Sequence, residues 1–171
     1  MEYITLKNTD IKVSRFCMGG CPMGGYGWGN VQESELLDAI SEALDKGVNF
    51  FDTADTYGLG QSERTLAKGL GEHRKNVVIE SKFGVRVGGG KTVYDNSPEY
   101  IQTALEESLR RLNTDYIDIY TIHYRDGKTP IADVIGKLDE LKAAGKIRHY
   151  GLSNIHGNEA DELISYAVFC L

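Results

Sequence analysis

The chain has 171 residues, enough for one domain with a real core, and its 41% hydrophobic and 26% charged residues are ordinary for a soluble globular chain. A formal net charge of −6 and the lack of an extended basic patch argue against a nucleic acid or an anionic membrane as a partner. Three cysteines cannot build a disulfide framework, and with no secretion signal or bilayer-length apolar run in view, we expect a cytoplasmic protein.

The first part of the chain predicts a β-hairpin. Apolar residues in 3–6 lead into the polar turn 7–10, and Ile11 and Val13 lead out of it. A short strand at 14–19 then runs into a glycine-rich loop that carries Tyr26 and Trp28.

Cys17 and Cys21 flank the end of that strand with C-x3-C spacing. A zinc site needs further Cys or His ligands, and neither a second cysteine pair nor a histidine lies close by in the sequence. We therefore expect core thiols and no metal site.

The next segment predicts an amphipathic helix that ends at Gly47. Asn30 and Glu33 have the spacing of a capping box. The apolar positions recur at helical intervals, at Leu36, Leu37, Ile40 and Leu44.

From this helix onward, strand and helix patterns alternate. The expected strands are 48–51, 77–82, 116–122 and 147–152. The expected helices are 62–70, one opened by Ser97-Pro98, one opened by Thr129-Pro130, and 159–171. Counted from the strand at 14–19, this is a βα unit repeated five times, which indicates a parallel sheet in a single domain spanning residues 1–171. The segment 84–96 is expected to be a loop that covers a pocket.

Polar side chains follow the ends of three consecutive expected strands. Asp52, Lys82 and His123 stand at those ends, and Tyr57 lies in the loop after the first of them. In a parallel βα barrel, the carboxyl ends of the strands hold the chemistry. Each residue alone has a plainer explanation, as a loop cap, a surface aromatic, a solvated lysine or a rim histidine. The repetition at equivalent positions favours a site.

These residue types suit proton transfer to an oxygen atom. A free tyrosine has a pKa of about 10, and a neighbouring lysine cation stabilises the phenolate and lowers that pKa. Asp52 would keep Lys82 charged and aimed, and His123 could orient a carbonyl group. None of these side chains supplies a hydride, so a cofactor must do so.

At this point the chain resembles the aldo-keto reductases. The matching segments are GVNFFDTADTYGLGQSE, VVIESKFG, IDIYTIH and GKIRHYGLSN, in the family's order, and they run to about Asn154. The likeness is greatest to the branch that includes potassium-channel β-subunits and bacterial general-stress reductases.

The resemblance implies a TIM-barrel (β/α)8 fold and NADPH-dependent reduction of aldehydes or ketones. Tyr57 would be the general acid, assisted by Asp52, Lys82 and His123. Ser153 and Asn154 would hold the nicotinamide carboxamide, with Asp52 beside it, and Trp28 or Tyr26 would line the substrate pocket.

The expected strands account for only part of such a barrel, which takes roughly 250 residues. The family's later strands supply an aromatic that stacks on the nicotinamide and basic residues for the adenosine phosphate, and neither has a counterpart here. A non-catalytic truncated barrel or a regulatory subunit is therefore the alternative function. We also expect self-association or a complementing chain, because an incomplete barrel leaves strand edges open.

Overall fold

The structure of the chain is a computed structural model, and it describes residues 1–88 and 90–154. The strands are β1 Tyr3–Thr5, β2 Lys12–Ser14, β3 Cys17–Gly19, β4 Phe50–Asp52, β5 Val78–Phe83, β6 Val85–Gly88, β7 Lys91–Tyr94, β8 Ile117–Ile122 and β9 Ile147–Leu152. The helices are α1 Glu33–Asp45, α2 Gln61–Leu70, α3 Pro98–Leu112 and α4 Ile131–Ala143. The helix expected at 159–171 lies outside the described residues.

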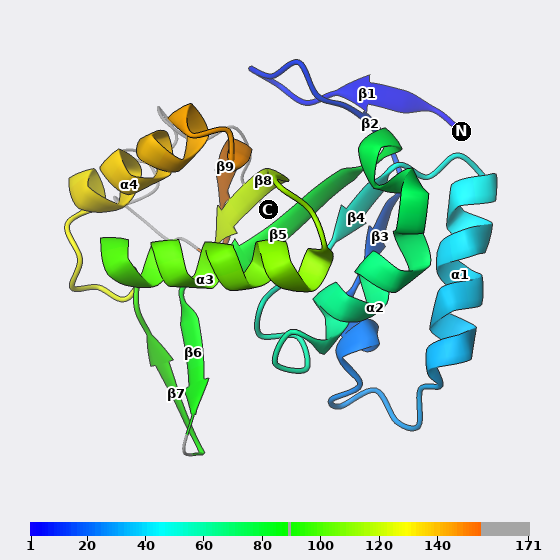
Figure 1. The fold of residues 1–171 in the computed structure, drawn as a ribbon, viewed down its shortest axis with the longest axis horizontal. Coiled ribbons are helices and arrows are strands. Elements are labelled where there is room, and N and C mark those ends of the chain that lie inside the picture. The colour runs from blue at the N-terminus through cyan, green and yellow to red at the C-terminus, as the bar shows by residue number, and fades with distance from the viewer. Residues whose placement is uncertain (89, 155–171) are drawn as a thin grey trace.

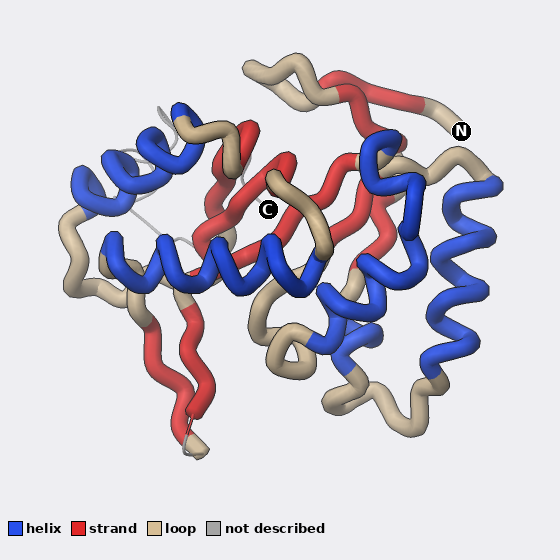
Figure 2. The backbone as a smooth tube through the Cα atoms, viewed as in Figure 1, coloured by secondary structure: helices blue, strands red, loops and turns tan. Residues whose placement is uncertain are grey.

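Five strands form one parallel sheet in the order β3-β4-β5-β8-β9, which is also their order along the chain. The helices that connect them lie along the outer side of the twisted sheet (Figures 1 and 2). Sequence-adjacent parallel strands joined by outer helices are the arrangement of a βα barrel, and the described part holds about five of its units. The predicted α/β fold is therefore confirmed.

The N-terminal hairpin covers the inner side of this sheet at the amino ends of the strands (Figure 1). β1 and β2 pair antiparallel, with Ile4 opposite Val13, as the sequence predicts. One apolar cluster joins the hairpin to the inner side chains of the sheet; its members are Leu6, Ile11, Val13, Phe50, Val78 and Ile119. The hairpin therefore closes the end of the sheet opposite to the strand ends that carry Asp52, Lys82 and His123.

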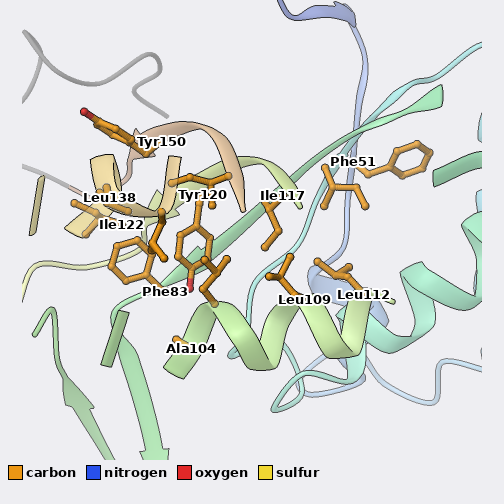
Figure 3. Packing of buried hydrophobic residues seen from close by; sticks show 14 of the residues in the cluster. Phe51, Phe83, Ala104, Leu109, Leu112, Ile117, Tyr120, Ile122, Leu138 and Tyr150 are labelled. Atoms are coloured by element: carbon orange, nitrogen blue, oxygen red, sulfur yellow. The ribbon is translucent and has the colours of Figure 1, made fainter. Parts of the chain in front are cut away.

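A larger apolar core fills the space between the sheet and its helices (Figure 3). Phe83 and Tyr120, from neighbouring strands, stack with ring centroids 4.6 Å apart. Leu105 and Leu109 of α3 belong to the same cluster. Side chains of a strand alternate between faces, so every second residue of β5 and β8 is free to face the inner side, where the polar residues lie.

A buried carboxylate, that of Glu63, connects the helices α2 and α3 to the sheet. Glu63 of α2 is fully buried, and its carboxylate accepts from Ser81 of β5 and from Arg111 of α3. Because a buried carboxylate is costly without partners, this bridge fixes α2 and α3 against the outer face of β5.

Two local predictions are wrong. The N-cap of α1 is Gln32, which makes no side-chain cap, and the Asn30 side chain accepts from Gln32 Nε2 instead of forming a capping box. Segment 84–96 is no irregular loop, because β6 and β7 pair antiparallel and project from the sheet (Figure 1). The start of α3 agrees with its prediction, since the Ser97 side chain accepts from Tyr100 N.

The two ends of the sheet are open within the described residues. β3 pairs only with β4, and β9 pairs only with β8. Beside β3, a hollow of about 560 Å³ is lined by apolar groups of β3 and α1, among them Met18 and Ala43, and Phe16 there is 63% exposed. An unpaired edge beside an apolar hollow favours association.

We therefore predict that a protein made of these 171 residues associates at low micromolar concentration. Size-exclusion chromatography with light scattering measures this directly. Phe16→Ser removes an exposed aromatic from the hollow and should weaken the association without touching the buried core. A monodisperse species of 18.9 kDa would contradict the prediction.

Candidate active site

The carboxyl ends of three neighbouring strands bring the predicted residues together. Asp52 ends β4, Lys82 is the penultimate residue of β5, and His123 follows β8 directly. In the parallel register Lys82 lies opposite Thr121, and the His123 N–H donates to Phe83 O at 2.8 Å. Tyr57 comes from the loop between β4 and α2, so all four side chains lie at the carboxyl ends of the strands.

The ammonium group of Lys82 is the centre of this group. The Lys82 side chain is 4% exposed, and its ammonium group forms an ion pair with Asp52 and donates to Thr53 O at 3.0 Å. Burial works to lower the pKa of Lys82, but the carboxyl groups of Asp52 and Glu80 outweigh it and raise the pKa above its ordinary value. Lys82 therefore stays charged at neutral pH although it is buried.

The phenol ring of Tyr57 lies over this charge. Lys82 Nζ is 5.2 Å from the ring centroid. Burial raises the pKa of Tyr57, and Lys82 works in the opposite direction without cancelling it. The sequence predicted a net lowering, which is wrong for this state of the protein. Tyr57 is a neutral phenol near pH 7 and can therefore act as a proton donor.

The loop that carries Tyr57 is held by a close approach of two backbones. Gly58 has φ +61°, and a Cβ atom on it would collide with the backbone of Gly24. A side chain on Gly24 would in turn meet Tyr57 C at 2.6 Å. Only glycine fits both positions, so contact between these two loops fixes the depth of the phenol.

His123 completes the group as a neutral imidazole. Its ring meets the Tyr57 ring edge to face, with centroids 5.9 Å apart. Burial and the nearby charge of Lys82 lower the pKa of His123 to about 4. Its Nδ1 is buried without a hydrogen-bond partner among the described residues. A neutral imidazole beside the phenol can hydrogen-bond an uncharged carbonyl oxygen.

Ser153 and Asn154 lie at the end of β9, next to His123. Ser153 is 8% exposed and its N–H donates to Ile122 O at 3.0 Å. Asn154 Nδ2 donates to His123 O and to Ser153 Oγ, both at 3.0 Å. This leaves the Asn154 amide oxygen as an acceptor beside a serine hydroxyl, a donor and acceptor set that suits a carboxamide group.

Tyr26 and Trp28 are exposed aromatic side chains. Tyr26 is 90% exposed and Trp28 is 55% exposed, on the loop that follows Gly24. Their place in a substrate pocket stays a prediction.

Two features were missed by the sequence reasoning. Tyr124 stacks on Tyr94 of β7 and lies 5.0 Å from the His123 ring, so aromatic rings run from Tyr57 to the hairpin. Glu80, two residues before Lys82 on the same face of β5, is 1% exposed. The alternation of a buried strand could have revealed Glu80, because a residue two positions from Lys82 shares its face.

Cys17 and Cys21 are both free thiols. Among the residues that the structure describes, no group of three or more His, Cys, Asp or Glu could hold a metal ion. Within the same part of the chain, none of the helices has the length and apolar character needed to cross a membrane.

Comparison with known proteins gives a consistent result. Residues 15–167 match the model of the aldo/keto reductase family. The NADH-specific methylglyoxal reductase of Escherichia coli is 38% identical to this chain, and the match covers 97% of this chain and 56% of that protein. The chain spans about half the length of the curated relatives it matches.

Solved structures agree with these sequence matches. The holo form of aldo-keto reductase AKR11C1 from Bacillus halodurans superposes with a TM-score of 0.88 at 34% identity, covering 98% of this chain and 55% of that one. An aldo-keto reductase from Klebsiella pneumoniae in complex with NADPH superposes with a TM-score of 0.74 at 29% identity, covering 91% and 51%.

The lowered pKa of His123 predicts that the stability contributed by this residue is lost in acid. Between about pH 6.5 and pH 4 the unfolded chain takes up a proton that folded His123 refuses, so the contribution of His123 to the free energy of unfolding falls as the pH falls. At about 1.4 kcal/mol per pKa unit this loss is at most about 3.5 kcal/mol, and less with solvent screening of the partly exposed ring. The buried carboxyl groups of Glu80 and Asp55, whose pKa values are raised to about 7 and about 8, contribute in the opposite direction, so the effect of His123 is the difference between the wild type and a His123 variant. Urea titrations from pH 8 to pH 4 measure it.

His123→Asn removes this titrating group, so between pH 6.5 and pH 4 the free energy of unfolding of the variant should shift upward relative to that of the wild type as the pH falls. His73→Asn, which removes a histidine outside the cluster, is the comparison for the substitution itself. Equal slopes in wild type and His123→Asn would refute the assignment.

Proposed function

We propose a function for this chain, which belongs to the aldo/keto reductase family. It is the acid–base half of an oxidoreductase that reduces aldehydes or ketones to alcohols with a nicotinamide cofactor. One observation carries the proposal: a buried, charged Lys82 lies between the carboxylate of Asp52 and the phenol of Tyr57. A solvated lysine or a structural ion pair needs no phenol above it.

The proton step follows from these positions. Tyr57 gives its proton to the carbonyl oxygen as negative charge develops there. Lys82 stabilises the resulting phenolate, and Asp52 keeps Lys82 in place and charged. His123, neutral near pH 7, donates a hydrogen bond that orients the carbonyl group.

The cofactor we infer is NADPH, which supplies the hydride when bound. Ser153 and Asn154 would hold its carboxamide, with Asp52 close by, because their hydroxyl and amide groups match it. The relatives differ in cofactor, since one is named NADH-specific and another was solved with NADPH. The choice between the two is therefore part of the proposal and of its test.

The substrate we infer is a small carbonyl compound, with Trp28 or Tyr26 at the rim of its pocket. Cytoplasmic action is also part of the proposal and rests on the unpaired Cys17 and Cys21. Because the chain spans about half of its relatives, a partner that completes the barrel is included, either a second copy or a complementing chain.

The alternative is a binding or regulatory module without catalysis. Fluorescence titration with NADPH and with NADH separates the two functions. We expect micromolar binding with a preference for NADPH. No binding at millimolar concentration of either cofactor would favour the module, and a preference for NADH would correct the cofactor alone.

Tyr57→Phe should remove the proton donor and keep the cofactor site. General acid catalysis contributes about 100-fold or more, so turnover of a nitrobenzaldehyde should fall by at least that factor while cofactor affinity stays within about twofold. Tyr116→Phe, a tyrosine before the start of β8, is the matched control and should keep wild-type turnover. Full activity of Tyr57→Phe would rule Tyr57 out as the acid.

A further inference from the structure

Glu80 is a buried carboxyl group on the inner face of the sheet. It is 1% exposed, and its backbone lies opposite Asp52 of β4 in the parallel register. Its Oε1 accepts from Thr121 Oγ1 at 2.7 Å, and its Oε2 is buried without a partner among the described residues. A half-satisfied buried carboxylate is costly, so its presence needs an explanation.

The surroundings of Glu80 offer one source of compensation. Glu80 and Lys82 share one face of β5. Asp52 lies opposite Glu80 in the register and forms an ion pair with Lys82, so two carboxyl groups and one ammonium group are neighbours. With Glu80 protonated these three groups are neutral together. With Glu80 ionised they carry one excess negative charge, and the Lys82 Nζ of this group lies 5.2 Å from the centroid of the Tyr57 ring.

We propose that Glu80 is a positioning residue for Lys82, and that the proton on Glu80 sets the net charge beneath Tyr57 and hence how readily Tyr57 releases its own proton. The inference rests on the proposed function for its meaning in catalysis. A negative charge beneath the phenol opposes formation of a phenolate, so proton donation by Tyr57 is favoured while Glu80 holds its proton.

The titration of Glu80 falls in the range where this matters. Burial and Asp52 raise the pKa of Glu80, while Lys82 and the Thr121 hydroxyl lower it, and the result is about 7. Glu80 in turn raises the pKa of Lys82. The two groups are therefore coupled, and a change of pH around neutrality changes the charge of the pair.

Few other groups compete for this role. The hollow in front of Glu80, of about 440 Å³, is lined by the N-terminal hairpin and by β3 and β4; its charged or titratable members besides Glu80 are Arg15, Cys17 and Asp52. Burial raises the pKa of Cys17 to about 12, so this thiol stays neutral. Arg15 is paired with Glu2 at 3.0 Å. From β8, the residues opposite Glu80 and Lys82 are the uncharged Ile119 and Thr121.

The first measurement is the titration of glutamate side chains in the wild-type chain, labelled with ¹³C at the δ-carboxyl position. Ordinary glutamates titrate at about 4.3. We expect one resonance that titrates near pH 7 and is missing from Glu80→Gln. Thr121→Val removes the hydroxyl donor and should move that resonance to higher pH. Titration of Glu80 below about pH 5 would overturn the proposal.

The second measurement is the pKa of Lys82 and of Tyr57, from ¹³Cε-lysine and ¹³Cζ-tyrosine spectra assigned with Lys82→Arg and Tyr57→Phe. Above pH 8 the wild type carries an ionised Glu80, so Glu80→Gln should lower both pKa values by about half a unit or more. Unchanged values in Glu80→Gln would overturn the proposal.

Glu63→Gln is the matched control, because Glu63 is a fully buried glutamate on the helical side of β5. Its loss leaves Arg111 paired with Glu107 and should not move the pKa of Lys82 or Tyr57. These readouts need no turnover. A chain that shows the coupling but reduces no carbonyl compound would refute the proposed function and leave the assignment of Glu80 intact.

Discussion

The structure of the site depends on a single buried charge. The Lys82 side chain is 4% exposed, and a buried ammonium group costs several kcal/mol unless it is paired and hydrogen-bonded. Asp52 and the carbonyl of Thr53 meet this requirement, and both come from the end of β4. The ion pair therefore ties the end of β5 to the end of β4. It also places a fixed positive charge beneath Tyr57, and this charge favours the phenolate form of the side chain.

The rest of the fold positions this pair. Parallel pairing of β4, β5 and β8 brings the carboxyl ends of three strands side by side. The N-terminal hairpin fills the opposite end of the inner face. Contact between Gly24 and Gly58 sets the depth of the Tyr57 loop. Each of these is a backbone constraint, so the geometry of the side chains follows from strand register and loop packing.

The sequence predicted those features that depend on pattern. Alternating strand and helix signals were sufficient to place Asp52, Lys82 and His123 at successive strand ends, because topology decides that placement. It could not predict features that depend on competing magnitudes. The pKa of Tyr57 is the clearest case, because burial raises it and Lys82 lowers it, and the residue types alone do not say which effect is larger. The β6–β7 hairpin was missed because its glycine-rich turn obscured the alternation of Val85 and Val87 with polar residues.

The same competition explains why a site of this kind concentrates charge below the phenol. Tyr57 is half-buried and Asp52 is 21% exposed, so any substrate or further polypeptide that covers the edge removes water from both. Removing water raises the pKa of a phenol further, which makes it a weaker acid. Only the fixed charges can offset that cost, and they grow stronger as the local dielectric falls. The effect of Lys82 on the pKa of Tyr57 therefore grows when the site is covered. The same holds for any carboxyl group that interacts with Lys82.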